Sequence, residues 1–191
     1  KGIIARVQLE EFSKGIILPH EFTLSKAKED RLNLMKATNC NFSQIYALYM
    51  DEKHTTLATI DEQSKAKADL EFTDETGVTH RLWIETDEEI IAKLVADFAD
   101  RKLYIADGHH RYETALNYRN YCRENGISKP CDPQDFQMIY LVDMEHPGLV
   151  VFPTHRLVRD LPNFDKEAVL EKCSEFFYID EKEGTDTMEE D

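Results

Sequence analysis

The feature that most constrains the fold is an apolar run, a single glycine and a helical pattern in direct succession. Residues 103–106 are apolar and predict a short strand, and residues 109–125 follow helical periodicity. Gly108 stands between the two segments, and Gly126 stands where a residue that ends the helix is expected. A strand that passes into a helix within one or two residues is typical of layered structures in which helices pack on a sheet.

Other segments predict further strands and helices around this unit. Strands are expected at 2–9, 16–18, 44–50, 136–142 and 149–152, with a hairpin at 70–73 and 78–85 that turns at Gly77. Helices are expected at 25–37, after the capping box Thr86-Asp87-Glu88-Glu89, and at 165–176, whereas residues 51–68 give no sharp signal. The mixed order of elements favours an α+β (mixed α/β) fold. One apolar face is expected on the middle helix, made by Ile90, Ile91, Leu94, Val95 and Phe98.

The domain organisation follows from where these patterns begin and end. We expect a single domain over residues 1–179, with an inserted hairpin region at about 51–85, and an acidic linker or tail over residues 180–191. The chain opens on a strand pattern without a start Met, so we expect it to be a fragment of a longer protein. The oligomeric state is not indicated.

The cellular setting is predicted from apolar runs and cysteines. No apolar run approaches the roughly 20 residues that cross a bilayer, so no membrane contact is expected. Four scattered cysteines without metal-ligand spacing fit a reducing compartment, which favours a cytoplasmic location. These are Cys40, Cys122, Cys131 and Cys173.

The overall charge limits the class of ligand. The formal net charge is −15, which argues against extended contact with nucleic acid, because such contact requires Lys and Arg to neutralise phosphates. A small anion remains compatible with this charge, since local geometry can override the net field.

The glycine turn has the chemistry of an anion site. A helix N-terminus presents unpaired N–H groups and the positive end of the helix dipole, and Gly108 lets a phosphate approach the backbone. His109, His110 and Arg111 add donors in the first turn, where cations are disfavoured unless an anion is bound. We expect the side chains of His110 and Arg111 to be exposed. The alternative is that Gly108 forms only a tight turn.

The residues Ile105-Ala106-Asp107-Gly108-His109-His110-Arg111-Tyr112 carry a resemblance. They resemble the signature box of a bacterial and archaeal family, domain of unknown function family 1015, within the ParB/sulfiredoxin-like superfamily. The free-serine kinases of that superfamily have a very similar box, whereas sulfiredoxins have Gly-Gly-Cys-His-Arg and ParB proteins Gly-Glu-Arg-Arg. In these three groups the box is a strand-to-helix turn that holds nucleotide phosphates. Segments 17–34 and 152–157 also resemble the unknown-function family.

The resemblance implies a ParB/sulfiredoxin-like layered domain with a mixed sheet and flanking helices, together with site roles. The turn would hold phosphates of ATP or ADP with Mg²⁺, and Glu21 would act as base on the hydroxyl of an unknown acceptor. His20 would orient Glu21 or touch phosphate. Because His109 occupies the position of the sulfiredoxin catalytic cysteine, reductase chemistry is not expected.

Three residues have alternatives that stay open at this stage. Asp107 either holds Mg²⁺, which prefers oxygen ligands, or caps the following helix. His155 and Arg156 follow a short apolar segment and either close over the anion or form a surface pair.

Three classes of function therefore compete. The leading hypothesis is a nucleotide-dependent phosphotransferase or NTPase resembling the free-serine kinases. The alternatives are a non-catalytic nucleotide-binding switch module and, third, a metal-dependent hydrolase that uses His20, Glu21, His109, His110 and His155. Neighbouring histidines on a helix point about 100° apart, which disfavours joint ligation of one metal. For the leading hypothesis, Glu21 must lie within about 12 Å of His110, the reach of one small ligand and one water.

Overall fold

The computed structural model describes residues 1–23, 25–151, 159–160 and 162–180. The chain divides into two compact units, Lys1–Val150 and Val151–Asp191, and each is described by itself. The second unit contains helix α5 (Lys166–Ser174), whose first turn is capped by the Asp165 carboxylate through the N–H of Ala168. This helix was expected; the single domain through residue 179 stays a prediction.

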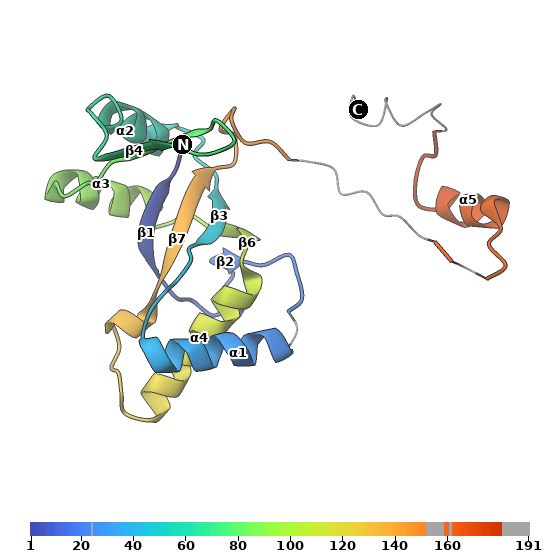
Figure 1. Ribbon diagram of the computed structural model, residues 1–191, viewed down its shortest axis with the longest axis horizontal. Coiled ribbons are helices and arrows are strands. Elements are labelled where there is room, and N and C mark those ends of the chain that lie inside the picture. The colour runs from blue at the N-terminus through green and yellow to red at the C-terminus, as the bar shows by residue number, and fades with distance from the viewer. Residues whose placement is uncertain (24, 152–158, 161, 181–191) are drawn as a thin grey trace. The chain divides into compact units, whose positions relative to one another are not determined.

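A mixed sheet of five strands organises the first unit (Figure 1). The strands are β1 (Ile3–Gln8), β2 (Ile17–Leu18), β3 (Ile45–Tyr49), β6 (Leu103–Asp107) and β7 (Phe136–Asp143), in the order β1-β7-β3-β6-β2. Strands β3 and β7 are parallel, as are β2 and β6, whereas β1 is antiparallel to β7 and β3 is antiparallel to β6. The expected α+β class is therefore confirmed.

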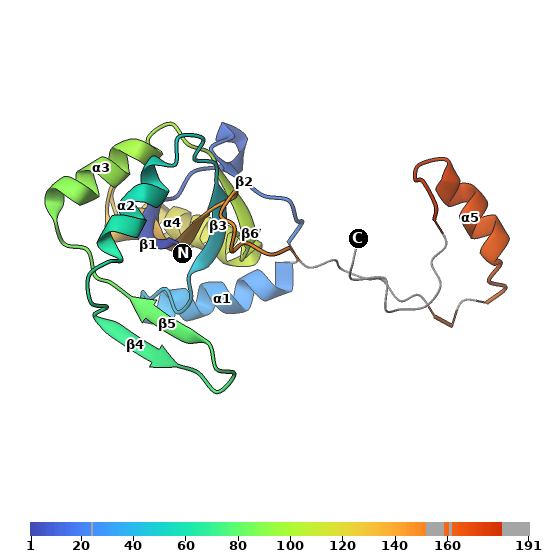
Figure 2. The ribbon, with the colours of Figure 1, turned by 90° about the horizontal axis from the view of Figure 1, so that it is seen from above.

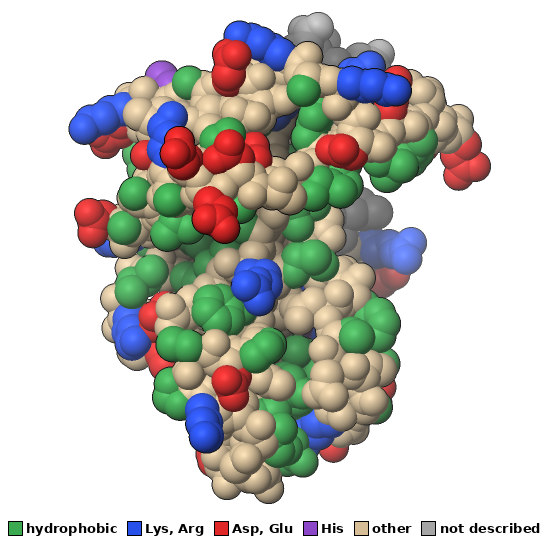
Figure 3. Space-filling model, turned by 90° about the vertical axis from the view of Figure 1, so that its left-hand side faces the viewer, with side chains coloured by type: hydrophobic (Ala, Val, Ile, Leu, Met, Phe, Trp, Pro, Cys, Tyr) green, Lys and Arg blue, Asp and Glu red, His purple; other side chains and the backbone are tan. Residues whose placement is uncertain are grey.

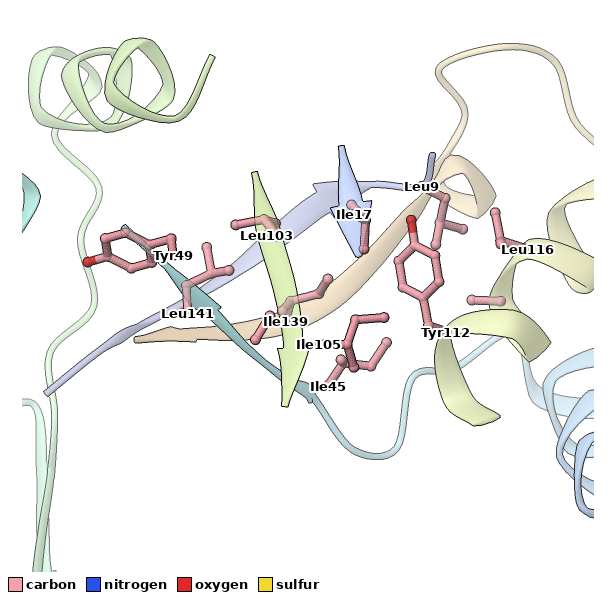
Figure 4. Close-up of a cluster of buried hydrophobic side chains, with 12 residues drawn as sticks. Leu9, Ile17, Ile45, Tyr49, Leu103, Ile105, Tyr112, Leu116, Ile139 and Leu141 are labelled. Carbon is pink, nitrogen blue, oxygen red and sulfur yellow. The ribbon is translucent and has the colours of Figure 1, made fainter. Parts of the chain in front are cut away.

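One face of the sheet forms the core together with helix α4 (His109–Glu124). Alternate residues of β3 are fully buried, because neighbouring side chains of a strand point to opposite faces. Helix α4 contributes Tyr112 to the same cluster (Figure 4). The Tyr112 ring stacks on that of Phe12, with centroids 5.2 Å apart. The buried cluster comprises Leu9, Ile17, Ile45, Ala47, Tyr49, Leu103, Ile105, Tyr112, Ala115, Leu116, Ile139 and Leu141.

The remaining elements lie around this core. Helix α1 (Ser25–Thr38) lies beside α4, while α2 (Thr55–Gln63) and α3 (Glu88–Phe98) lie near the other end of the sheet (Figure 1). Strands β4 (Leu70–Thr73) and β5 (Thr79–Leu82) form the expected hairpin, which projects from the rest of the unit (Figure 2). Two short 3₁₀ turns, η1 (Phe12–Lys14) and η2 (Pro133–Asp135), complete the unit.

Helix α3 differs in detail from its expected form. Its N-cap is Asp87 rather than Thr86, because the Asp87 carboxylate accepts the N–H groups of Glu89 and Ile90. Phe98 packs on the core with its ring centroid 4.7 Å from that of Tyr49. Ile91 and Val95, however, are 42% and 66% exposed, so the apolar face is only partly covered.

Two other segments differ from what the sequence indicated. Residues 51–68, which give no sharp signal, contain α2, whose first N–H groups donate to the buried carboxylate of Asp51. The strand expected at 149–152 is absent from its described part, residues 149–151, where Val150 and Val151 are 65% and 84% exposed.

The surface is charged and mixed. On the face shown in Figure 3, acidic and basic side chains are interspersed, without a continuous basic area. Among the described helices, none is both long and apolar enough to cross a membrane.

Candidate functional site

The strand-glycine-helix turn has the predicted form. Strand β6 ends at Asp107 and α4 begins at His109, with Gly108 as N-cap at φ 98° and ψ 26°. The positive φ at Gly108 favours glycine, and a Cβ there would lie 2.9 Å from Nη2 of Arg111, so the guanidinium would have to shift. The first helical hydrogen bond runs from the Tyr112 N–H to the Gly108 carbonyl at 3.0 Å. The backbone N–H groups of residues 109–111, which precede this bond, have no acceptor carbonyl within α4.

The sheet topology brings two other segments to this turn. Because β2 and β6 are parallel, the residues after β2 emerge at the same edge as Gly108. Because β3 is antiparallel to β6, the start of β3 lies there too, with Tyr46 opposite Asp107. The turn is therefore flanked by residues 19–23 on one side and by residues 43–44 on the other.

His109 connects the turn to the segment after β2. Its ring is buried, with 2% exposure, and its Nε2 accepts the backbone N–H of His20 at 3.2 Å. The Nδ1 atom faces Glu21, whose Oε2 lies 3.5 Å away. The rings of His20 and His109 meet edge to face, with centroids 4.5 Å apart. Glu21 thus lies beside the turn, next to the residue that precedes His110, as the leading hypothesis requires.

The charge state of His109 follows from this environment. Burial lowers the pKa of the imidazole below 6.5, and the neighbouring His20 lowers it further. The negative charges of Glu21 and Asp107 raise the pKa, but by less. The ring is therefore neutral at pH 7. Since Nε2 accepts a hydrogen bond, the proton is assigned to Nδ1, the nitrogen that faces the Glu21 carboxylate.

A second anchor holds the same loop to α4. Glu113 accepts hydrogen bonds from the Thr23 hydroxyl at 2.7 Å and the Lys28 ammonium at 2.6 Å. Burial raises the pKa of the Glu113 carboxyl, but these two hydrogen bonds, with the charges of Lys28 and His110, outweigh burial and lower it. The loop is thus fixed at His20 and Thr23, and the Glu21 side chain between them is 59% exposed.

Arg111 connects the turn to the start of β3. Its guanidinium donates to the Ser43 hydroxyl at 3.0 Å, to the Gln44 carbonyl and to the Asp107 carboxylate. Only 22% of its side chain is exposed, so the expected exposure of Arg111 was wrong. The cause is the antiparallel neighbour β3, whose first residues lie against the turn.

Asp107 does not cap α4. Helix α4 has Gly108 as N-cap and no side-chain cap, and the Asp107 carboxylate accepts from Arg111 instead. Its side chain is 73% exposed at the edge of the turn. Of the two roles weighed for Asp107, capping is therefore excluded, and the metal role stays a prediction.

The other expected site residues lie as follows. His110 is partly buried in the first turn of α4, and its carbonyl accepts the Thr114 hydroxyl at 2.6 Å. His155 and Arg156 lie outside the described residues. Sequence reasoning missed the anchoring residues Thr23, Lys28, Ser43, Gln44 and Glu113, and none of them lies in a motif that marks its role.

The donor set limits the metal chemistry. Within the described part of the chain, no group of three or more His, Cys, Asp or Glu side chains is placed to hold a metal ion. A Mg²⁺ ion bound through one carboxylate and substrate phosphates needs no such group. Asp107, an exposed carboxylate next to the turn, fits that mode of binding.

Comparison with known families decides the membership of this chain. Residues 1–190 match the model of the family described as protein of unknown function (DUF1015). The chain belongs to this family. The membership expected from residues 105–112 is thereby confirmed, whereas the relation to the ParB/sulfiredoxin-like superfamily is a proposal. No curated protein and no solved structure matches the chain, so the function of this DUF1015 member has to be argued from its site.

Proposed function

We propose that this chain is a nucleotide-dependent phosphotransferase, or an NTPase, that resembles the free-serine kinases and holds the phosphates of ATP or ADP at residues 108–111. The observation that carries the proposal is the Glu21 carboxylate 3.5 Å from His109 at a strand-glycine-helix turn. The mixed sheet with helices beside it supports a ParB/sulfiredoxin-like layering, which is part of the proposal.

The phosphates are bound by backbone and side chains together. The N–H groups and the dipole of the α4 N-terminus favour an anion, and the left-handed Gly108 allows its close approach. Arg111 uses three of its five N–H donors on Ser43, Gln44 and Asp107, and the two others serve the phosphate. His110 adds a donor from the same turn. His109 was expected as a phosphate ligand, but its Nε2 accepts the His20 backbone N–H, so in this proposal it positions Glu21 instead.

Glu21 acts as the general base. The acceptor hydroxyl oxygen attacks the terminal phosphorus, its proton passes to a Glu21 carboxylate oxygen, and the bond from phosphorus to the bridging oxygen of the nucleotide breaks. The leaving nucleotide takes the bond electrons. His109 Nδ1–H and the His20 backbone N–H hold the loop so that Glu21 faces the turn.

Asp107 is the residue that would hold Mg²⁺. The ion would neutralise charge on the phosphate oxygens, which is the usual contribution of Mg²⁺ to phosphoryl transfer. Arg111, hydrogen-bonded to the same carboxylate, keeps that carboxylate at the edge of the turn.

The test is product formation with a matched variant. The chain is incubated with ATP or ADP, Mg²⁺ and free serine, and phosphorus NMR follows phosphoserine and free phosphate. Glu21→Gln is expected to slow transfer about a hundredfold or more with little change in nucleotide affinity, since a general base contributes roughly 10²–10⁴ in rate. Glu75→Gln, in the exposed hairpin turn, is the control and should match the wild type.

Each outcome separates the hypotheses. Phosphoserine identifies a kinase, and phosphate release without phosphoserine identifies an NTPase. Nucleotide binding without either product contradicts transfer to serine or water and favours the switch module.

A further inference from the structure

The first turn of α4 has two chemically different sides. Residues 109 and 111 point about 200° apart around a helix, from roughly 100° per residue. His109 faces Glu21 on the β2 side, whereas Arg111 faces Ser43 and Gln44 on the β3 side. A phosphate on this turn would therefore have the base on one side and the start of β3 on the other.

A groove opens on the Arg111 side. It lies between α1, the connection from α1 to β3, and α4. It is lined by Arg31, Leu34, Met35, Cys40, Asn41, Phe42, Ser43, Arg111, Thr114 and Gln137. Arg111 and Ser43 belong both to this groove and to the surroundings of the turn, so the two are continuous.

The groove is small, with a volume of about 60 Å³, so a nucleoside would lie over it and not be enclosed by it. Its lining has groups that bind a planar base and a sugar. Phe42 lines it and is 65% exposed, which leaves much of its ring for stacking. Arg31 adds an exposed guanidinium, whose planar group stacks on or donates to a base. The side-chain amide oxygen of Asn41 accepts the Met138 backbone N–H at 3.4 Å. Within the described residues, the N–H₂ group of the same amide is available to a ligand.

We propose that this groove binds the nucleoside part of the nucleotide whose phosphates lie on the Gly108 turn, an inference that rests on the proposed function. In-line phosphoryl transfer supports this assignment, because the attacking and leaving oxygens lie on opposite sides of the transferred phosphorus. Glu21 activates the attacking hydroxyl, so the leaving nucleotide extends away from Glu21, toward Arg111 and the groove. The acceptor then occupies the Glu21 side.

Cys40 gives a direct test because it lines the groove and is exposed. The full chain is alkylated with iodoacetamide in the presence of Mg²⁺ and either ATP or inorganic tripolyphosphate, and the rate at each cysteine is followed by peptide mass spectrometry. ATP should slow the alkylation of Cys40 at least fivefold, and tripolyphosphate should change it less than twofold. Cys131, which is exposed and outside the groove, should react at the same rate throughout.

A matched pair of variants measures the stacking. Phe42→Ala should raise the Kd for ATP about tenfold and leave the Kd for tripolyphosphate unchanged, since base–aromatic stacking acts only on the nucleoside. Phe72→Ala, which removes an exposed hairpin phenylalanine, should change neither constant.

These experiments distinguish a wrong groove assignment from a wrong proposed function. If ATP binds but neither protects Cys40 nor responds to Phe42→Ala, the nucleoside lies elsewhere and only the groove assignment is wrong. If ATP does not bind at all, both proposals are overturned.

Discussion

The ring of His109 accepts the backbone N–H of His20 across 89 residues of sequence, at 3.2 Å. This contact joins the end of β2 to the first turn of α4. It places the Glu21 carboxylate beside the glycine turn, so the proposed chemistry and the stability of the turn depend on the same buried imidazole.

His109→Ala should destabilise the fold by about 1–3 kcal/mol, because it leaves the His20 N–H without its acceptor. His109→Gln should restore part of that loss, since a glutamine carbonyl reaches roughly as far as Nε2. Urea unfolding of both variants measures the difference. Equal losses in the two variants would show that the hydrogen bond is not what stabilises the loop.

The lowered pKa of His109 predicts a pH dependence of stability. The unfolded chain, with its His109 pKa near 6.5, takes up the proton more readily than the folded chain. The stability linked to His109 is therefore fully present above about pH 6.5 and is lost as pH falls through that value toward the folded pKa. Urea unfolding from pH 7.5 to 5.5 should show a steeper loss for the wild type than for His109→Gln. Parallel curves would contradict the lowered pKa.

Gly108→Ala should cost more stability than Gly126→Ala. Both glycines have positive φ, 98° and 68°, so both substitutions carry backbone strain of about 1–2 kcal/mol. Only at Gly108 does the new Cβ also meet Arg111, at 2.9 Å, whereas nothing lies within 4 Å at Gly126. Thermal unfolding should rank the variants in that order, and only Gly108→Ala should weaken phosphate binding. The reverse order would contradict the packing of Arg111 over the turn.

Arg111→Ala should reduce stability as well as anion binding. The variant loses the hydrogen bonds to Ser43 and Gln44, for an expected cost of about 1–2 kcal/mol. Arg81→Ala removes an exposed arginine that pairs with Glu71 in the hairpin, and should cost less than about 0.5 kcal/mol. Chemical unfolding compares the two. An Arg111→Ala protein as stable as Arg81→Ala would mean that Arg111 does not hold the start of β3.

Much of the fold was predictable because its signals are local. The apolar run before Gly108, the periodic helix after it and Gly126 at its end each carry their own pattern, and Gly126 has the expected positive φ. Helix α2 was missed because its first turn depends on the Asp51 carboxylate four to six residues away, which is itself held by Arg101 from a later segment. Residues 149–152 were predicted as a strand from composition alone. In the described part of that range, Val150 and Val151 are exposed, so no burial of their side chains favours strand pairing.

The candidate site was predictable only in part. The approach of Glu21 to the turn follows from two strands that end at the same edge of a sheet. The burial of His109 and the bond from Arg111 to the start of β3 could not be predicted, because both depend on which strands flank β6. Strand order is a tertiary property that no motif in residues 103–111 specifies.

The measurement that tests the central claim most directly is calorimetric titration of the full chain with ATP, ADP and inorganic phosphate in the presence of Mg²⁺. The account predicts saturable nucleotide binding that His110→Ala weakens roughly ten- to a hundredfold, the loss of one charge-assisted hydrogen bond of about 1.5–3 kcal/mol. No detectable binding of either nucleotide by the wild-type chain would contradict the assignment of residues 108–111 as a phosphate-binding turn.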